Sequence, residues 1–394
     1  MTIGVKYIAH GSTSGYALAA VAYVRALHNA GIPVWWQAWH VGEEPVQFRM
    51  EDWRPAQGDA GLADLAALVR ATRGPIPYDT VVVHTVPEHW PRFAEAGKRF
   101  VGYTVWEVDA LPEHWPRLLD LADLILVPSC FTAEIFVRGG VTRPVRVVPH
   151  IRRHAWSDTA RDDAARVRGR LRIPEDHFVF YTIGAWDPRK ALPELVDAFA
   201  REFRAEERVT LVIKTSAALS NAAIDTQPGA GTRERAQRVA AEAALAAGRP
   251  AASVACVGAD NIDGRAMDAI HAAGDAYVSL AHGEGWGMGA FEAATLGKPV
   301  IITGWGGQLD YLGADYPGLV RYALAPVSGW LPYASYRPAQ RWAQADAQHA
   351  RTLMRLALAR DGSLRDAALK AREAIITRFA EPVVAREFVA AING

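Results

Sequence analysis

Residues 276–303 read AYVSLAHGEGWGMGAFEAATLGKPVIIT. The segment begins with an apolar run typical of a buried strand, passes through a glycine-rich loop and continues into an alanine-rich stretch over 290–296 that predicts a helix. Glycines let a ligand approach the backbone closely, and a helix N-terminus favours oxygen-rich or anionic groups. The segment therefore predicts an α/β fold with a ligand site beyond the carboxyl end of this strand.

Apolar runs separated by helical patterns occur on both sides of residue 150, which indicates parallel β/α units. At 394 residues the chain is longer than the roughly 250–300 residues that one hydrophobic core usually serves, so two domains are expected. We predict doubly wound, Rossmann-like domains over 1–165, joined by a C-terminal helix at 377–394, and over 166–376, facing one another across a cleft. The charged stretch at 152–172, which lacks clear periodicity, is expected to connect them. The predicted strands lie at 5–9, 81–84, 100–105, 124–128 and 145–149, and then at 178–186, 209–215, 253–258, 276–281 and 299–303.

Composition excludes several classes of protein. Lys plus Arg and Asp plus Glu both number 43, so the chain has no broad positive field for nucleic acid. No apolar run approaches the roughly 20 residues that cross a bilayer, and the first residues lack the apolar core of a secretory signal, so we expect the mature chain to begin there. Cys130 and Cys256 are far apart without C-x-x-C spacing, which fits structural cysteines in a reducing cytoplasm. The oligomeric state is left open.

Two glutamates stand eight positions apart in the glycine-rich segment. Glu284 lies in the loop and Glu292 in the predicted helix, so both side chains can face one cleft, one from the loop and one from the helix. In this setting, EGWGMGAFE (284–292) resembles the E-x(7)-E signature of the retaining GT-B glycosyltransferases of family 4. The following GKPVIIT (297–303) and GWGGQLDYL (304–312) continue the resemblance.

The resemblance implies an activity and a set of donor contacts. It implies transfer of a sugar from a nucleoside-diphosphate sugar to a hydroxyl acceptor, a saccharide or glycoconjugate, with retention of anomeric configuration and without a metal or other cofactor. Glu284 would lie beside the donor sugar as a catalytic residue, and Glu292 would bind the ribose hydroxyls. The backbone of the loop would hold sugar hydroxyls through Gly285, Trp286, Gly287 and Met288.

Basic residues follow two strands of the second domain. Arg189 and Lys190, in IGAWDPRK (183–190), resemble the basic pair of the family, and Lys214 ends the run at 209–215. Fixed cations there would stabilise the negative charge that grows on a leaving diphosphate. Ala185 stands about where many family members carry another arginine, so the dominant cation is left open. No Asp-x-Asp pair suited to Mg²⁺ was found in a strand-end loop.

The first domain supplies weaker signals. HGSTSG (10–15) resembles the glycine-rich turn that approaches the donor in this family, through Gly11, Ser12 and Gly15; it is not G-x-G-x-x-G, which disfavours a dehydrogenase. Glu107 and Asp109 stand where many relatives place a histidine, and each is either an acceptor or donor-sugar contact or a loop and helix-cap residue. His84, at the end of a predicted strand, is equally open.

Other functions share this scaffold. A sugar-nucleotide epimerase or a phosphorylase is the main alternative, and a non-catalytic sugar- or nucleotide-binding module is disfavoured because the glutamates and basic residues are both present. A polyprenyl-linked acceptor would place the chain peripherally on the inner membrane face, although no clear basic amphipathic helix is evident. The nucleobase, the sugar and the acceptor are left open. Five tryptophans of the first domain either stack on a saccharide or pack internally: Trp35, Trp36, Trp39, Trp106 and Trp115.

Overall fold

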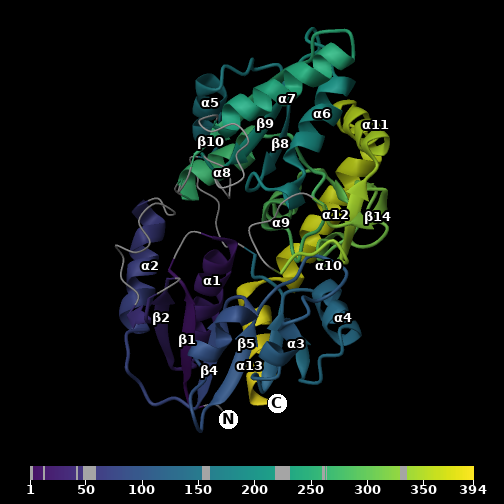
Figure 1. Ribbon diagram of the computed structural model, residues 1–394. Coiled ribbons are helices and arrows are strands. Elements are labelled where there is room, and N and C mark those ends of the chain that lie inside the picture. Colours follow the sequence, from purple (N-terminus) through teal and green to yellow (C-terminus); the bar gives the residue numbers. More distant parts are fainter. Residues whose placement is uncertain are drawn as a thin grey trace. The chain divides into compact units, whose positions relative to one another are not determined.

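The structure is a computed structural model that describes residues 3–11, 14–40, 43–47, 59–152, 160–217, 231–259, 262, 264–328 and 335–394. The chain divides into two compact units (Figure 1): residues 1–154 with 375–394, and residues 155–374. The second unit therefore begins before helix α5 (Ala160–Arg170), whereas the sequence places a boundary at 165, inside this helix.

The first unit is built on a parallel sheet. Within the described ranges it has seven strands in the order β3-β2-β1-β4-β5-β6-β7, all paired in parallel except β2 with β3. The order reverses at β1, so the loops after β1 and β4 flank the point where ligands bind in open α/β sheets. The strands are β1 (Val5–His10), β2 (Val34–Trp39), β3 (Val46–Gln47), β4 (Thr80–His84), β5 (Arg99–Tyr103), β6 (Leu124–Val127) and β7 (Val145–Val147).

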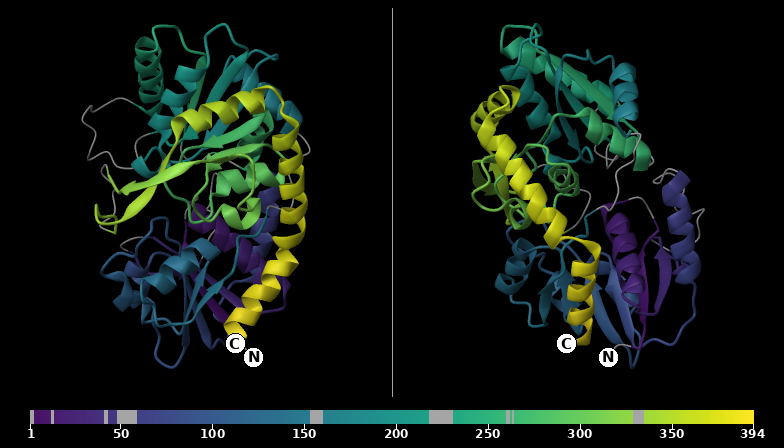
Figure 2. Two further views of the ribbon diagram at one scale, coloured as in Figure 1. Left: turned by 90° about the vertical axis from the view of Figure 1, so that its right-hand side faces the viewer. Right: turned by 180° about the vertical axis from the view of Figure 1, so that it is seen from behind.

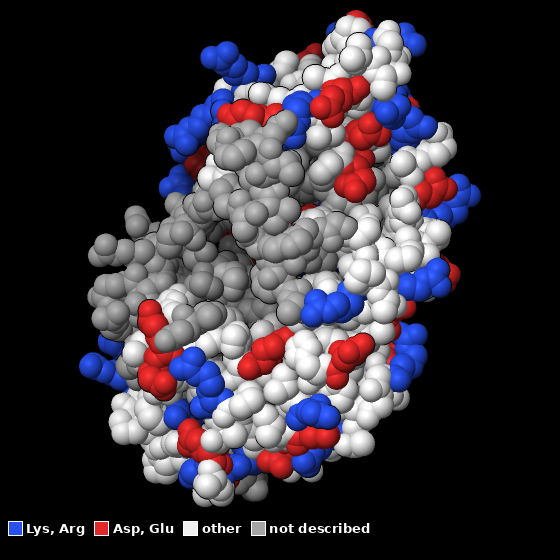
Figure 3. Space-filling model, viewed as in Figure 1, with Lys and Arg blue, Asp and Glu red and all other residues white. Residues whose placement is uncertain are grey.

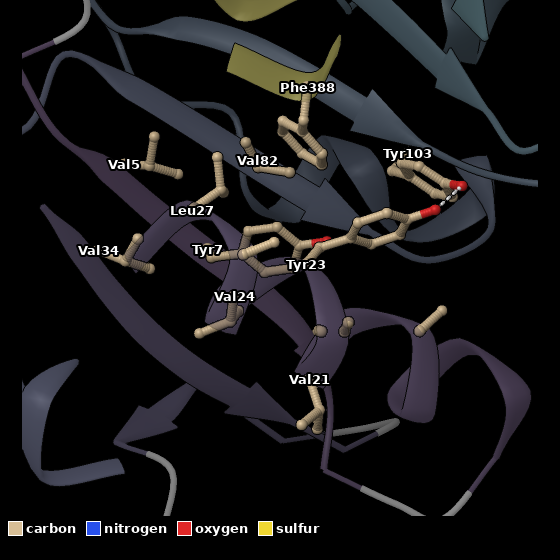
Figure 4. Close-up of a cluster of buried hydrophobic side chains, with 14 of the residues drawn as sticks. Val5, Tyr7, Val21, Tyr23, Val24, Leu27, Val34, Val82, Tyr103 and Phe388 are labelled. Carbon is tan, nitrogen blue, oxygen red and sulfur yellow. Dashed lines mark hydrogen bonds between the residues drawn. The ribbon is translucent and has the colours of Figure 1, made fainter. Parts of the chain in front are cut away.

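Helices cover this sheet, and the last one comes from the far end of the sequence. Ser14 caps α1 by accepting a hydrogen bond from Ala17 N, and Ser129 caps α4 in the same way. Helix α13 packs against α1 (Figure 2), and its Phe388 contacts Tyr7 and Tyr23 in the core (Figure 4). The helical elements are α1 (Gly15–Asn29), α2 (Asp59–Ala71), the 3₁₀ turn η2 (Pro87–Arg92), α3 (Trp115–Leu119), α4 (Cys130–Arg138) and α13 (Glu381–Asn393).

The second unit repeats the plan. In the part of the chain that is described, its sheet has six parallel strands in the order β10-β9-β8-β11-β12-β13, and a separate antiparallel hairpin joins β14 to β15. The order reverses at β8, which places the loops after β8 and β11 at the switch point. The strands are β8 (Phe178–Ile183), β9 (Val209–Thr215), β10 (Ser253–Gly258), β11 (Ala276–Ser279), β12 (Val300–Thr303), β13 (Leu319–Val320), β14 (Tyr322–Pro326) and β15 (Arg341–Ala345).

The charged stretch at 152–172, expected to connect the two domains, contains the boundary between the two units and the helix α5, which packs against α8 (Gly264–Ala273). Asp163 on α5 accepts hydrogen bonds of 2.6 and 2.9 Å from Arg265 on α8, so ionic contacts and packing hold a helix that has little apolar periodicity. The helical elements are α5, the 3₁₀ turn η3 (Pro188–Lys190), α6 (Leu192–Glu202), α7 (Thr232–Ala246), α8 (Gly264–Ala273), α9 (Met288–Thr295), α10 (Leu309–Leu312), α11 (Ala347–Leu358) and α12 (Gly362–Arg378), which continues into the first unit.

The surface matches the balanced composition. On the face shown in Figure 3, basic and acidic side chains are interspersed. Cys130 is exposed and Cys256 is buried, and they do not form a disulfide with each other. Among the residues that the structure describes, no helix is both long and apolar enough to cross a membrane.

Candidate active site

The glycine-rich loop after β11 is held by a second glycine loop. Helix α9 begins at Met288, two residues before the predicted start, and Gly287 precedes it with a φ of +82°, which glycine adopts without strain. Gly307 N donates a hydrogen bond of 2.7 Å to Glu284 O. A Cβ on Gly306 would lie only 2.6 Å from that same carbonyl oxygen. The two loops therefore fix the backbone at Glu284.

The carboxylate of Glu284 is paired with both residues of the predicted basic pair. Lys190 Nζ lies 2.6 Å from Oε1, and Arg189 Nη1 lies 3.5 Å from Oε2. Arg189 Nη1 also donates to Gly283 O at 2.7 Å. Burial raises the pKa of the Glu284 carboxyl, but the charges of Lys190 and Arg189 outweigh it and leave the pKa below its usual value. The three side chains form an ionised cluster with one net positive charge.

The basic pair is positioned by the turn that follows β8. Asp187 caps this turn by accepting a hydrogen bond of 3.1 Å from Lys190 N. Ala191 ends it with a φ of +48°, in the left-handed region that is uncommon for residues other than glycine. His282 N then donates to Arg189 O at 2.7 Å, which ties this turn to the loop after the neighbouring strand β11. The cations therefore lie at the switch point of the sheet.

Lys214 occupies a different environment from the other two cations. Its side chain is buried at the end of β9, and its Nζ donates to Thr215 O at 3.1 Å and to Ala259 O at 2.9 Å. These bonds join the ends of β9 and β10, next to each other in the sheet. Ala185, where family members often carry arginine, is exposed after β8.

Glu292 has a buried partner that the sequence did not indicate. Its Oε2 lies 2.9 Å from His271 Nε2, and His271 Nδ1 lies 2.9 Å from the Tyr181 hydroxyl. His271 belongs to no motif, because it sits in an ordinary helical stretch 21 positions before Glu292. Only the packing of α8 against the switch point brings it there.

The side chain of Trp286 is part of the core. It is 2% exposed and packs against Phe291 and Tyr311, with ring centroids 5.1 and 5.2 Å away. The Tyr311 hydroxyl donates to Gly287 O at 3.2 Å, which further holds the loop. Within the predicted donor-binding stretch Gly285–Met288, Trp286 thus has a packing role in addition to any contact of its backbone.

The predicted loop of the first unit is only partly described. Gly11 N donates to Trp39 O at 3.1 Å, and a Cβ on Gly11 would lie 2.8 Å from His40 Nε2, so a larger residue would require a rearrangement. Gly15 is the first residue of α1. Ser12 lies outside the described residues.

His84 lies in the core of the first unit. It is 1% exposed, its Nδ1 lies 2.9 Å from the Tyr7 hydroxyl, and the ring of Tyr103 is 4.2 Å away. Burial, with smaller contributions from His150 and His10, lowers the pKa of His84 well below its usual value. His84 therefore packs among buried side chains, and its role as an acceptor or sugar contact stays a prediction.

Glu107 and Asp109 lie half-buried in the loop after β5. Tyr16, on α1, accepts a hydrogen bond of 3.2 Å from Val105 N in this loop. Burial and then the charge of Glu107 raise the pKa of Tyr16. Four of the five tryptophans pack internally, since Trp36, Trp39, Trp106 and Trp115 are at most 3% exposed, whereas Trp35 is half-buried beneath Lys6.

The sequence around the Glu284 cluster matches a known family. Residues 163–322 match the family model described as glycosyl transferases group 1. The match lies within the second unit. It contains Glu284, Glu292 and all three predicted cations. Among curated proteins, none matches the chain.

Solved structures extend the likeness to both units. Sucrose-phosphate synthase from Thermosynechococcus elongatus is 16% identical, with a TM-score of 0.63 over 99% of this chain and 98% of that one. HepE of Anabaena, in complex with UDP and glucose, is 15% identical, with a TM-score of 0.60 over 99% of both chains. A glycosyltransferase from Rickettsia africae ESF-5 is 11% identical, with a TM-score of 0.65 over 98% of this chain and 97% of that one. The predicted two-domain GT-B fold is confirmed.

Proposed function

We propose that this chain is a retaining glycosyltransferase that moves a sugar from a nucleoside-diphosphate sugar to a hydroxyl acceptor, without a metal or other cofactor. The observation that carries the proposal is the ionised cluster of Glu284, Lys190 and Arg189 at the switch point, inside the region that matches the glycosyl transferases group 1 model. HepE, which has a similar fold, was solved with UDP and glucose, and this supports a nucleotide-sugar donor.

The charges in the cluster suit this reaction. The bond between the anomeric carbon and the phosphate oxygen breaks, and negative charge grows on the leaving diphosphate. Lys190 and Arg189 stabilise that charge from positions set before the reaction begins, which is the most effective form of electrostatic catalysis. Glu284 accepts hydrogen bonds from the sugar and stabilises positive charge at its anomeric carbon.

The anomeric configuration is retained if the leaving phosphate also takes the proton of the acceptor hydroxyl. The acceptor oxygen bonds to the anomeric carbon on the face from which the phosphate departs, and the acceptor proton passes to the departing phosphate oxygen. No protein nucleophile is required.

Glu292 binds the ribose, the loop Gly285–Met288 and the turn at Gly11–Gly15 contact the donor, and Lys214 supports the diphosphate side. In the first unit we assign acceptor contacts to Glu107 and Asp109.

The first experiment identifies the donor and the stereochemistry. UDP-, GDP- and ADP-sugars are screened by calorimetry, and the donor that binds is then incubated with cell-extract acceptors, including polyprenyl-linked saccharides in detergent. Mass spectrometry finds the product and NMR gives its anomeric configuration, which we expect to be that of the donor. Inversion would contradict the mechanism. Conversion of the donor without an acceptor, or a requirement for inorganic phosphate, would identify the epimerase or the phosphorylase instead.

The second experiment tests the assigned carboxylate. Glu284→Gln keeps the shape of the side chain and removes its charge, and we expect kcat to fall by about two to three orders of magnitude, as for other electrostatic groups at reacting centres. The matched control is Glu206→Gln, because Glu206 is exposed in the same unit. A folded Glu284→Gln variant with the turnover of the control would show that the cluster is not the active site.

A further inference from the structure

A buried tyrosine–histidine pair stands behind the carboxylate of Glu292. Tyr181 lies on β8, His271 near the end of α8 and Glu292 within α9. The Tyr181 hydroxyl is 2.9 Å from His271 Nδ1, and His271 Nε2 is 2.9 Å from Glu292 Oε2. Three elements that are distant in sequence thus meet in one hydrogen-bonded chain that ends on a carboxylate.

The chemistry of the three groups defines the direction of these hydrogen bonds. An ionised carboxylate only accepts, so His271 donates its Nε2–H to Glu292. In the neutral imidazole Nδ1 is then an acceptor, and it receives the hydroxyl proton of Tyr181. Burial, the neighbouring Tyr277 and the charge of Glu292 raise the pKa of Tyr181 well above its usual value, so this hydroxyl keeps its proton. Tyr181 therefore selects the tautomer of His271 that supports Glu292.

The pair has little freedom to move. Tyr181 and His271 are both fully buried, and their rings meet edge to face with centroids 5.4 Å apart. The ring of Tyr277 also meets the Tyr181 ring edge to face, with centroids 5.3 Å apart. A Cβ on Gly274 would lie 2.1 Å from the Tyr181 ring. The side chain of Glu292, by contrast, is 14% exposed. A rigid, buried donor thus holds one oxygen of a carboxylate that itself reaches the surface of the unit.

Building on the function proposed above, we propose that His271, held by Tyr181, is a positioning residue that orients the Glu292 carboxylate toward the ribose hydroxyls of a nucleoside diphosphate. A free glutamate loses rotamer entropy when a ligand immobilises it. A glutamate that is already oriented avoids this cost, and the gain appears as affinity for the groups that it contacts. The effect of His271 should therefore be confined to ligands that carry ribose hydroxyls.

The test compares nucleotides with and without those hydroxyls. Calorimetry measures the Kd of UDP, GDP and ADP, each beside its 2′,3′-dideoxy counterpart, for the wild-type chain and its variants. The wild type is expected to bind the ribonucleotide about ten- to a hundredfold more tightly than the dideoxy form, as hydrogen bonds to a charged group would give. His271→Leu should bring this ratio close to one. His271→Gln retains an N–H for Glu292 and should keep most of the preference, and Tyr181→Phe should reduce it a few-fold.

Controls separate positioning from stability. His177→Leu replaces a histidine that is bonded to Thr210 at the amino edge of the same sheet, and it should leave the ratio unchanged. If His271→Leu does not fold, His271→Gln and Tyr181→Phe provide the test. A smaller preference for the ribonucleotide in Tyr181→Phe supports the inference. The wild-type preference in both variants overturns it. A folded His271→Leu variant with the wild-type ratio overturns this inference alone, whereas a wild type that binds none of the three nucleotides overturns the proposed function with it.

Discussion

The carboxyl edges of the two sheets carry different kinds of polar group. In the second unit, Glu284 is ionised between Lys190 and Arg189. In the first unit, the buried groups are imidazoles and phenols, and burial lowers the pKa of His84 and brings that of His150 down to about 3. One scaffold thus supports a charged edge and a neutral edge. This difference supports our proposal that the diphosphate binds to the second unit, because fixed cations there would stabilise the charge of a leaving diphosphate.

The neutral edge is organised by tyrosine hydroxyls. The Tyr23 and Tyr103 hydroxyls lie 2.6 Å apart (Figure 4), and Tyr103 donates to Val148 O at 2.9 Å. The Tyr23 hydroxyl also lies 3.1 Å from Val148 O and 2.9 Å from His150 Nδ1, so both hydroxyls share this carbonyl acceptor. The buried side chains of this edge are therefore neutral, and the carboxylates Glu107 and Asp109 lie half-buried in the loop after β5.

The largest expected effect concerns the charged edge. Lys190→Ala removes the cation that is 2.6 Å from Glu284, and we expect kcat for donor turnover to fall by about two to three orders of magnitude, since a fixed charge at the leaving group is lost. Steady-state kinetics with the donor from the nucleotide screen measures the loss. Lys370→Ala, an exposed lysine of the same unit, is the control and should change little. Equal turnover in the two variants would remove the distinction between the edges.

A change at the neutral edge should lower the free energy of unfolding and leave nucleotide binding unchanged. Tyr7→Phe leaves His84 Nδ1 without the hydroxyl that is 2.9 Å away, and a buried polar atom that loses its partner costs about 1–3 kcal/mol of unfolding free energy. Urea denaturation measures this difference, and the Kd of the donor nucleotide should stay at its wild-type value. Tyr322→Phe, which alters a partly exposed tyrosine, is the control. Weaker nucleotide binding by Tyr7→Phe would contradict a role of the Tyr7–His84 pair in stability alone.

The pH dependence of stability should identify the buried imidazoles. Unfolded His150 gains a proton below its ordinary pKa of 6.5, while the folded residue stays neutral down to about 3. The unfolded state then binds more protons in this window, so the free energy of unfolding falls as pH drops, by up to about 1.4 kcal/mol per pH unit for each such histidine. Denaturation between pH 6.5 and 4 should show a shallower slope for His150→Gln than for the wild type. Identical slopes would mean that His150 titrates normally in the folded chain.

The smallest expected effect is that of a chelator. If Lys190 and Arg189 neutralise the diphosphate themselves, EDTA should leave turnover of the donor unchanged. Activity is measured with EDTA and again after added Mg²⁺ or Mn²⁺. A loss that either metal restores would show that the charged edge needs a metal ion in addition to its side chains.

Sequence patterns predicted the parallel strands well where these were continuous apolar runs, as at β8 and β9. They missed β2, because the tryptophans of its sequence VWWQAW were considered only for whether they stack on a saccharide or pack internally. They also missed α5, since a helix held by the Asp163–Arg265 pair has no clear apolar stripe. Both elements depend on partners elsewhere in the chain, so local periodicity carries little sign of them.

The candidate site likewise has features that the local sequence determined and features that depend on distant partners. The sequence by itself determined the glycine loop and the spacing of Glu284 and Glu292, because these depend on φ angles and on residues that are close along the chain. Only the tertiary structure decided that Lys190 meets Glu284 from 94 positions away and that His271 meets Glu292. The physical reason is the parallel sheet, which gathers the carboxyl ends of its strands at one edge whatever their distance in sequence.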